Sequence, residues 1–133
     1  MSARLQALTI TFGIDRPLAD VYAFASRPEN FPQWASGLCK SIERAGKDWM
    51  AETPMGRLRV RFTDNNAFGI LDHFIYPDAS SEIYVPMRLI PNGDGTEVIF
   101  TLFRMPDMSE EKFAADAAWV EADLKALKRI LET

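Results

Sequence analysis

The chain of 133 residues is long enough to bury a hydrophobic core and is predicted to form one domain, 1–133. Its net charge of −4, with 47% hydrophobic residues, describes a mildly acidic globular protein and argues against nucleic acid as a partner, because phosphate binding needs a dominant basic surface. No apolar run approaches the roughly 20 residues of a membrane span, and the single cysteine permits no internal disulfide.

The N-terminal segment begins MSARLQALTI and lacks the apolar centre of a secretory signal, so we expect a cytoplasmic protein. Apolar residues alternate with smaller or polar ones from Leu8 to Ile14, which predicts a first strand. The strand ends before Pro17, and a proline suits the start of a helix. Pro28 begins a second short helix, with Trp34 at its end.

The middle of the chain is a series of short alternating segments separated by turn residues, which predicts an antiparallel meander. The predicted strands are Gly37–Arg44, Trp49–Thr53, Arg57–Asp64, Phe68–Tyr76, Glu82–Ile90 and Glu97–Met105. Arg57, Arg59 and Arg61 alternate with apolar residues, so we interpret them as the solvent face of a strand. With the first strand, this gives a sheet of six to seven strands that must twist and curl.

The last segment predicts a long helix that begins after Ser109, which suits an N-cap followed by two acidic residues. Its apolar residues recur at spacings of four and three along one stripe. They are Phe113, Ala117, Val120, Leu124, Leu127 and Leu131.

The predicted fold class is therefore α+β, a curved antiparallel sheet wrapped around the C-terminal helix, with two short helices closing one end. A concave sheet of this kind is not filled by its own side chains, so we expect a hydrophobic ligand cavity between the sheet and the helix. The expected ligand-binding residues are Trp34, Phe62, His73, Met87, Phe100, Leu102, Val120 and Leu124.

The order of these elements resembles the SRPBCC superfamily, the helix-grip fold of START domains and the birch pollen allergen. The segments that carry the resemblance are ITFGIDRPLADVYAFASRPENFPQW, FGILDHFIYPD and MSEEKFAADAAWVEADLKALKRILE, and together they extend it over essentially the whole chain. The chain is most similar to small bacterial members called polyketide cyclase/dehydrase-like. The resemblance implies a cavity that in relatives holds lipids, sterols, hormones or aromatic polyketides, and it supplies no shared catalytic residues.

Asp72 and His73 are the candidate catalytic residues if the protein is an enzyme. Neighbouring residues of a strand face opposite sides, so only one of them can point inward. We favour His73, because burying an unpaired aspartate is costly. Tyr84 is a further candidate for a polar group that orients a ligand.

Trp119 and Asp116 lie on the final helix beside the apolar stripe. Trp119 would pack against the sheet edge or, as an alternative, form a homodimer contact. Asp116 could reach the rim of the cavity and pair with Arg88 or Arg104, although a solvated acid is the simpler interpretation. One histidine and Cys39 give no metal-ligand spacing, so we expect neither a metal nor another cofactor.

Three functions follow as hypotheses. The first is the binding or transport of a small hydrophobic ligand, lipid-like or aromatic, without catalysis. The second is a cyclase or dehydratase that uses the same cavity and a proton transfer by His73 or Asp72. The third is a protein-interaction module, which predicts a filled core and an exposed apolar patch around Trp119.

Overall fold

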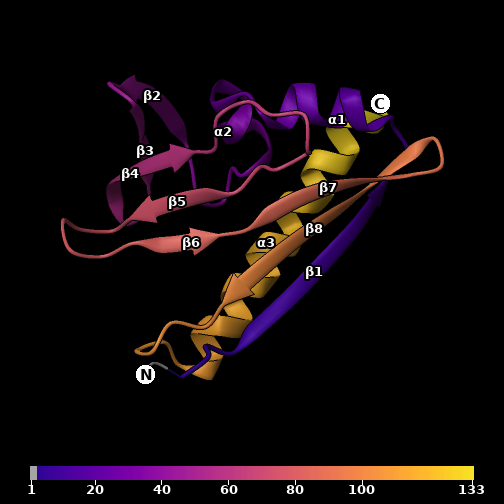
Figure 1. The fold of residues 1–133 in the computed structure, drawn as a ribbon. Coiled ribbons are helices and arrows are strands. Elements are labelled where there is room, and N and C mark those ends of the chain that lie inside the picture. The colour runs from indigo at the N-terminus through magenta and orange to yellow at the C-terminus, as the bar shows by residue number, and fades with distance from the viewer. Residues whose placement is uncertain (1–2) are drawn as a thin grey trace.

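Two antiparallel sheets and one long helix form the structure, a computed structural model that describes residues 3–133 (Figure 1). The strands are β1 (Ala7–Ile14), β2 (Ser41–Ala45), β3 (Asp48–Thr53), β4 (Gly56–Phe62), β5 (His73–Tyr76), β6 (Ile83–Val85), β7 (Met87–Asn92) and β8 (Gly95–Phe103). The helices are α1 (Leu18–Ala25), the 3-10 turn η1 (Pro28–Asn30), α2 (Phe31–Trp34) and α3 (Glu110–Glu132). The predicted order of a strand, two short helices, a series of strands and a long helix is confirmed.

The sheet topology corrects the predicted single sheet of six to seven strands. Eight strands lie within residues 3–133, in a three-stranded sheet of order β1-β8-β7 and a five-stranded sheet of order β2-β3-β4-β5-β6. The predicted strand Glu82–Ile90 is divided at Pro86, because proline has no N–H to donate to a ladder. β6 therefore pairs with β5, whereas β7 pairs with β8, and the chain crosses from one sheet to the other at this residue.

The predicted strand Phe68–Tyr76 is also shorter in the structure, where it begins at His73. The residues before it form a loop around Asn66, whose side-chain oxygen accepts from the backbone N–H groups of Phe68 and Ile70. Gly69 has a φ of 71°, a left-handed conformation that is incompatible with the predicted strand. This loop contacts the three-stranded sheet, since the N–H of Leu89 on β7 donates to the Gly69 carbonyl at 2.9 Å.

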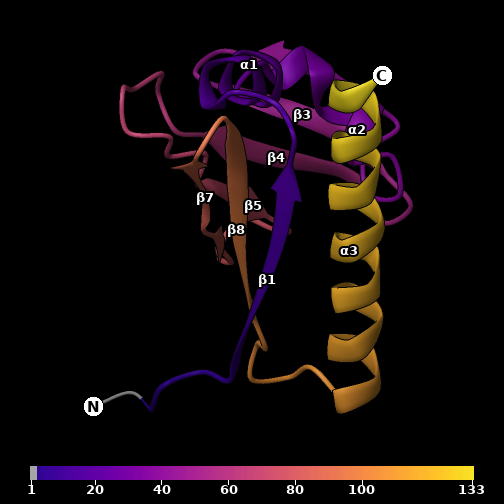
Figure 2. The same ribbon diagram turned by 90° about the vertical axis from the view of Figure 1, so that its right-hand side faces the viewer.

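Helix α3 lies behind β1, β7 and β8 in Figure 1 and stands beside β1 when the molecule is turned (Figure 2). Ser109 caps it as predicted, because the Ser109 side-chain oxygen accepts from the Lys112 N–H at 3.1 Å. The stripe residues Leu124, Leu127 and Leu131 are buried in the main core, together with Ile14 and Val98 of the three-stranded sheet. The contacts of these leucines with the core thus fix the position of α3 relative to the three-stranded sheet.

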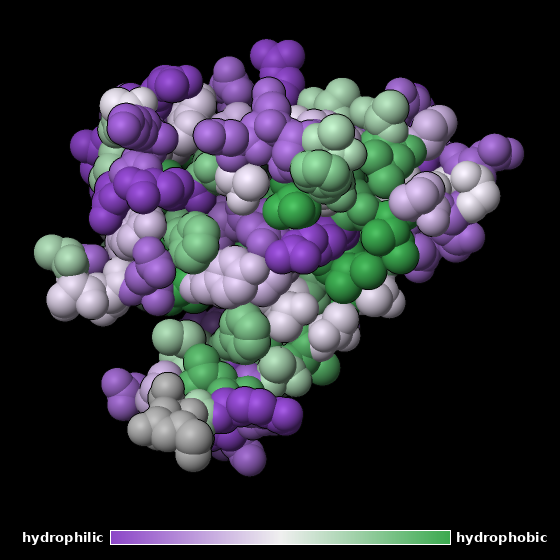
Figure 3. All heavy atoms as spheres, in the orientation of Figure 1, coloured by the Kyte–Doolittle hydropathy of each residue, from purple (hydrophilic) through white to green (hydrophobic). Residues whose placement is uncertain are grey.

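The outer surface is mixed. On the face of Figure 1, hydrophobic side chains lie in groups between hydrophilic ones (Figure 3). None of the helices within residues 3–133 combines the length and the apolar character needed to cross a bilayer.

Candidate ligand-binding cavity

A cavity of about 290 Å³ lies between the five-stranded sheet, β8 and the helices α2 and α3. Most of its lining is apolar. The sheets contribute Leu58, Ile75, Ile83, Val85, Phe100 and Leu102. The helices contribute Phe31, Trp34, Ala35, Trp119, Val120 and Leu124. This volume is at the lower end of the range for small-molecule sites, about 300–1,000 Å³.

The structure brings most of the expected ligand-binding residues to this cavity. Trp34, His73, Phe100, Leu102, Val120 and Leu124 line it. Phe62 and Met87 do not, and instead line a small adjoining hollow of about 20 Å³. Trp34 and His73 line both spaces, so these two rings form part of the wall between them.

His73 is buried, with 4% of its surface exposed, and its ring packs against Phe31 and Phe62. Its Nδ1 lies 3.2 Å from the carbonyl oxygen of Leu71. A carbonyl only accepts, so the proton belongs on Nδ1 and Nε2 is left as an acceptor. Burial lowers the pKa of His73, which keeps the ring neutral at physiological pH.

Asp72 belongs to a separate cluster. Its carboxylate accepts from Arg88, from the Tyr84 hydroxyl at 2.7 Å and from the Met87 N–H at 2.9 Å. Burial alone would raise the pKa of Asp72, but these hydrogen bonds hold it below its usual value. Neither Asp72 nor Tyr84 lines the large cavity. Of the two neighbouring candidates, the structure therefore places only His73 in its wall.

Asp123 is an acid of the cavity that the sequence analysis did not single out. It lines the wall on α3 beside Leu124, and burial raises its pKa to about 7. Lys112, Asp116, Trp119 and Asp123 follow one another at spacings of four, three and four, the same rhythm as the apolar stripe. All four line the cavity, so this spacing was the sequence signal that could have identified Asp123 as a cavity residue.

Asp116 reaches the cavity, as the sequence suggested, but its partner is different. The Lys112 ammonium group donates to the Asp116 carboxylate one helical turn away. Arg88 is engaged by Asp72, and Arg104 donates to the Met108 carbonyl. Trp119, on the same face, is 49% exposed and lines the cavity.

Trp34 is 4% exposed, and its indole Nε1 is buried without a hydrogen-bond partner among residues 3–133. Its ring packs edge-on against Phe31, with centroids 5.1 Å apart. An unpartnered N–H in an apolar wall costs free energy. Trp34 therefore belongs both to the buried core and to the cavity wall.

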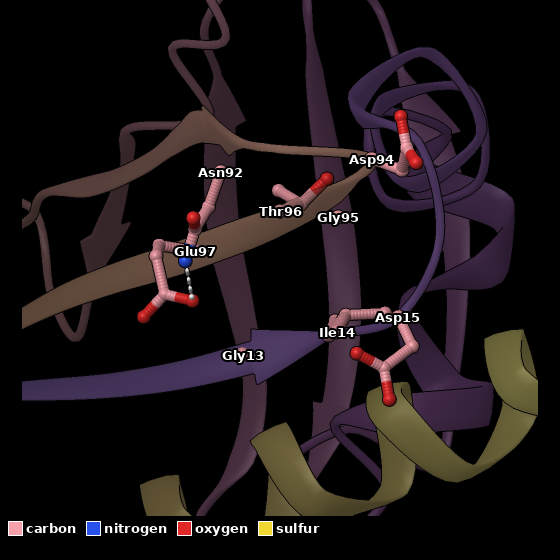
Figure 4. A pocket seen from close by; sticks show the side chains of 8 residues that line it. All are labelled: Gly13, Ile14, Asp15, Asn92, Asp94, Gly95, Thr96 and Glu97. Carbon is pink, nitrogen blue, oxygen red and sulfur yellow. Dashed lines mark hydrogen bonds between the residues drawn. The ribbon is translucent and has the colours of Figure 1, made fainter.

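A third space, a hollow of about 330 Å³, lies where β1 ends beside the β7–β8 turn (Figure 4). Asp15, Asp94 and Glu97 line it, but their carboxylates point in different directions, and Glu97 accepts from the Asn92 side chain at 3.4 Å. Within the described residues, no group of three or more His, Cys, Asp or Glu side chains is placed to hold a metal ion. This hollow is therefore a polar surface depression.

The chain matches no family model and no curated protein sequence. Several solved structures share its fold. An uncharacterised protein from Bacillus thuringiensis matches with a TM-score of 0.77 at 15% identity, over 96% of this chain and 100% of that one. DynU16, a protein of the dynemicin biosynthetic locus, matches with a TM-score of 0.72 at 16% identity, over 96% of this chain and 47% of DynU16. The Aha1 dimer from Colwellia psychrerythraea matches with a TM-score of 0.73 at 14% identity, over 96% and 97%. At these identities the similarity concerns the fold alone.

Proposed function

We propose that this chain is a helix-grip domain of the SRPBCC type that binds one small, largely apolar ligand, aromatic or lipid-like, between its sheets and α3. The observation that carries the proposal is the cavity of about 290 Å³ with its apolar lining. Burial of apolar ligand surface there contributes roughly 25 cal/mol per Å², so about 200 Å² supplies ~5 kcal/mol before the cost of association. The fold likeness to DynU16, a protein of the dynemicin biosynthetic locus, supports a cavity for a small biosynthetic molecule.

The test is to purify the protein from its own host and to identify co-purifying small molecules by native mass spectrometry. Val120→Phe fills the cavity from α3 and should abolish retention of the ligand. Leu8→Phe is the matched control, because Leu8 is 40% exposed on β1 and does not line the cavity. Retention by Val120→Phe at the level of the control would exclude this cavity as the site.

Catalysis by the same cavity is the second candidate, and the neutral His73 in its wall is the observation that favours it. An unprotonated Nε2 can remove a proton from a carbon between two carbonyl groups of a bound polyketide, and that carbon can then attack a further carbonyl. The π bond of the attacked carbonyl opens to an alkoxide, to which the His73 imidazolium returns the proton. Orientation of the chain by the walls would supply most of the rate. His73→Gln should then abolish cyclisation while ligand retention persists. Unchanged turnover would remove His73 from the mechanism.

A protein-interaction module is the least supported function. That hypothesis predicted a core filled by side chains, whereas the structure contains the cavity described above. Trp119 is explained by its place in the cavity wall, without a second copy of the chain. The Aha1 neighbour is a dimer in solution, so the fold is compatible with dimers. The mass of the purified protein in solution decides whether this chain forms one.

A further inference from the structure

Asp123 is the one acidic side chain in the cavity wall that has no partner among residues 3–133. Its carboxyl group makes none of the hydrogen bonds or ion pairs that hold the other cavity acid, Asp116. On the side of the α2–β2 loop it faces Gly37, which has no side chain; a Cβ there would lie 3.8 Å from Asp123 Oδ1. The carboxyl group is thus left free to interact with whatever occupies the cavity.

The charged groups around the cavity do not compensate an ionised Asp123. Lys112 is paired with Asp116 and lies eleven residues away, about 16 Å along the helix at 1.5 Å per residue. His73, on β5, is neutral. Desolvation therefore acts alone on Asp123 and raises its pKa to about 7, so the carboxyl group is mostly protonated below pH 7 and loses its proton as the pH rises through that value.

A protonated carboxyl is a hydrogen-bond donor, and the neutral His73 supplies an acceptor from the sheet side of the same cavity. Apart from the unpartnered but buried Trp34 N–H, the walls then offer Asp123 as a donor and His73 as an acceptor, while Lys112 and Asp116 neutralise each other. A carboxylate ligand would meet no unpaired cation there, since Lys112 is engaged by Asp116, and its desolvation would not be compensated. A ligand with an uncharged oxygen avoids the free-energy cost of desolvating a charge.

Building on the proposed function, we propose that Asp123 selects and orients the ligand by donating a hydrogen bond from its carboxyl group to a carbonyl or hydroxyl oxygen of an uncharged aromatic molecule. Asp123 is thus the specificity-determining residue of the site. Because deprotonation removes the donor and introduces an unpaired negative charge near the ligand oxygen, binding weakens as the pH rises through about 7.

The test uses four naphthalenes of similar size: 2-acetylnaphthalene, 2-ethylnaphthalene, 2-naphthoate and 2-(aminomethyl)naphthalene. Dissociation constants are measured by calorimetry for the full chain at pH 5.5 and at pH 8.5. At pH 5.5 the ketone should bind about tenfold more tightly than the ethyl analogue, which is the worth of one good hydrogen bond. Its affinity should fall roughly tenfold at pH 8.5, whereas that of the ethyl analogue should change little.

Variants assign the effect to Asp123. Asp123→Asn keeps an uncharged donor, so it should keep the preference for the ketone and lose its pH dependence. Asp123→Leu should lose the preference altogether. Glu121→Gln is the matched control, since Glu121 is an exposed acid of the same helix that does not line the cavity, and it should behave as the unmodified chain does.

Two results would overturn the inference while leaving the proposed function intact. One is equal affinity for the ketone and the ethyl analogue at both pH values. The other is tightest binding of the amine, strengthening at pH 8.5 and lost in Asp123→Asn, which would make Asp123 the counter-ion of a cationic ligand. Failure of all four probes, the ethyl analogue included, would instead overturn the proposed function together with this inference.

Discussion

Arg88 holds Asp72 in a two-pronged ion pair: its Nε donates to Asp72 Oδ1 at 2.9 Å, and its Nη2 donates to Oδ2 at 2.8 Å. Asp72 precedes β5 of one sheet, whereas Arg88 lies on β7 of the other. The pair therefore ties the two sheets together beside the Pro86 crossing. Tyr84 and the Met87 N–H complete the hydrogen bonding of the carboxylate.

Arg88→Ala should destabilise the protein by about 2 kcal/mol, because it leaves a mostly buried carboxylate without its cation. Arg57→Ala is the control. Arg57 pairs with Glu43 and Glu52 at exposed positions, where such contacts contribute less than about 1 kcal/mol. Urea denaturation of both variants measures the difference. Equal losses would show that the Asp72 cluster does not join the sheets energetically.

The pH dependence of stability should carry the signature of Asp123. Its pKa is about 7 in the folded chain and about 4 in the unfolded chain, so between these values the folded state binds more protons. The free energy of unfolding should thus fall as the pH rises from about 4 to about 7 and level off above that, by at most ~4 kcal/mol at 1.36 kcal/mol per pKa unit. Partial contact of the carboxyl with solvent reduces this figure.

Asp123→Asn should remove that fall. Urea denaturation of the chain and the variant at pH 4.5, 6 and 8 compares them directly. Asp72 acts in the opposite sense: its lowered pKa contributes stability above about pH 4 that is lost as the pH falls through its folded value. The two contributions separate along the pH axis. An unchanged slope in Asp123→Asn would mean that Asp123 titrates as an exposed acid.

The sequence predicted the element order and α3 because these depend on local patterns: the stripe from Phe113 to Leu131, the Ser109 cap and the prolines that start helices. The division into two sheets was not predicted, although Pro86 lies within the predicted strand Glu82–Ile90. A proline within an alternating run reads as a weakened strand, and whether the chain then changes sheets depends on partners far away in sequence.

The cavity wall shows the same limit. His73 was favoured over Asp72 on the cost of burying an acid, and the structure places His73 in the cavity wall. Asp123 was missed, because an acid beside an apolar stripe normally faces water. Here the cavity extends past the stripe to the face of Trp119. Phe62 and Met87 likewise have the correct alternation but line the adjoining hollow.

Gly69→Ala should destabilise the protein by roughly 2–3 kcal/mol. Its φ of 71° is unfavourable for alanine, and the new Cβ would lie 2.5 Å from the Leu89 carbonyl oxygen, a backbone atom. Gly46→Ala is the control, with a φ of 66° but no atom within 4 Å of its Cβ, so it should lose only about 1 kcal/mol. Equal losses in thermal denaturation would show that the loop moves away from β7 at no cost.

Cys39 should resist alkylation in the folded protein. It is fully buried, and burial raises the pKa of its thiol to about 11, so almost no thiolate exists at pH 8. Iodoacetamide followed by mass spectrometry should detect an unmodified native chain and a rapidly modified one in urea. Rapid labelling without urea would contradict the packing of the segment between α2 and β2.

Phe100 and Leu127 distinguish a cavity wall from a solid core. Both are buried, at 8% and 0% exposure, but only Phe100 lines the cavity. Leu127→Ala should cost about 3 kcal/mol, as in other tightly packed interiors. Phe100→Ala removes a larger side chain, yet it should cost only about 2 kcal/mol, because one side of the ring already lacks packing partners. Urea denaturation without ligand measures both. A loss of ~4 kcal/mol or more for Phe100→Ala would mean that protein atoms surround the ring, and that the space beneath α3 is closed to a ligand.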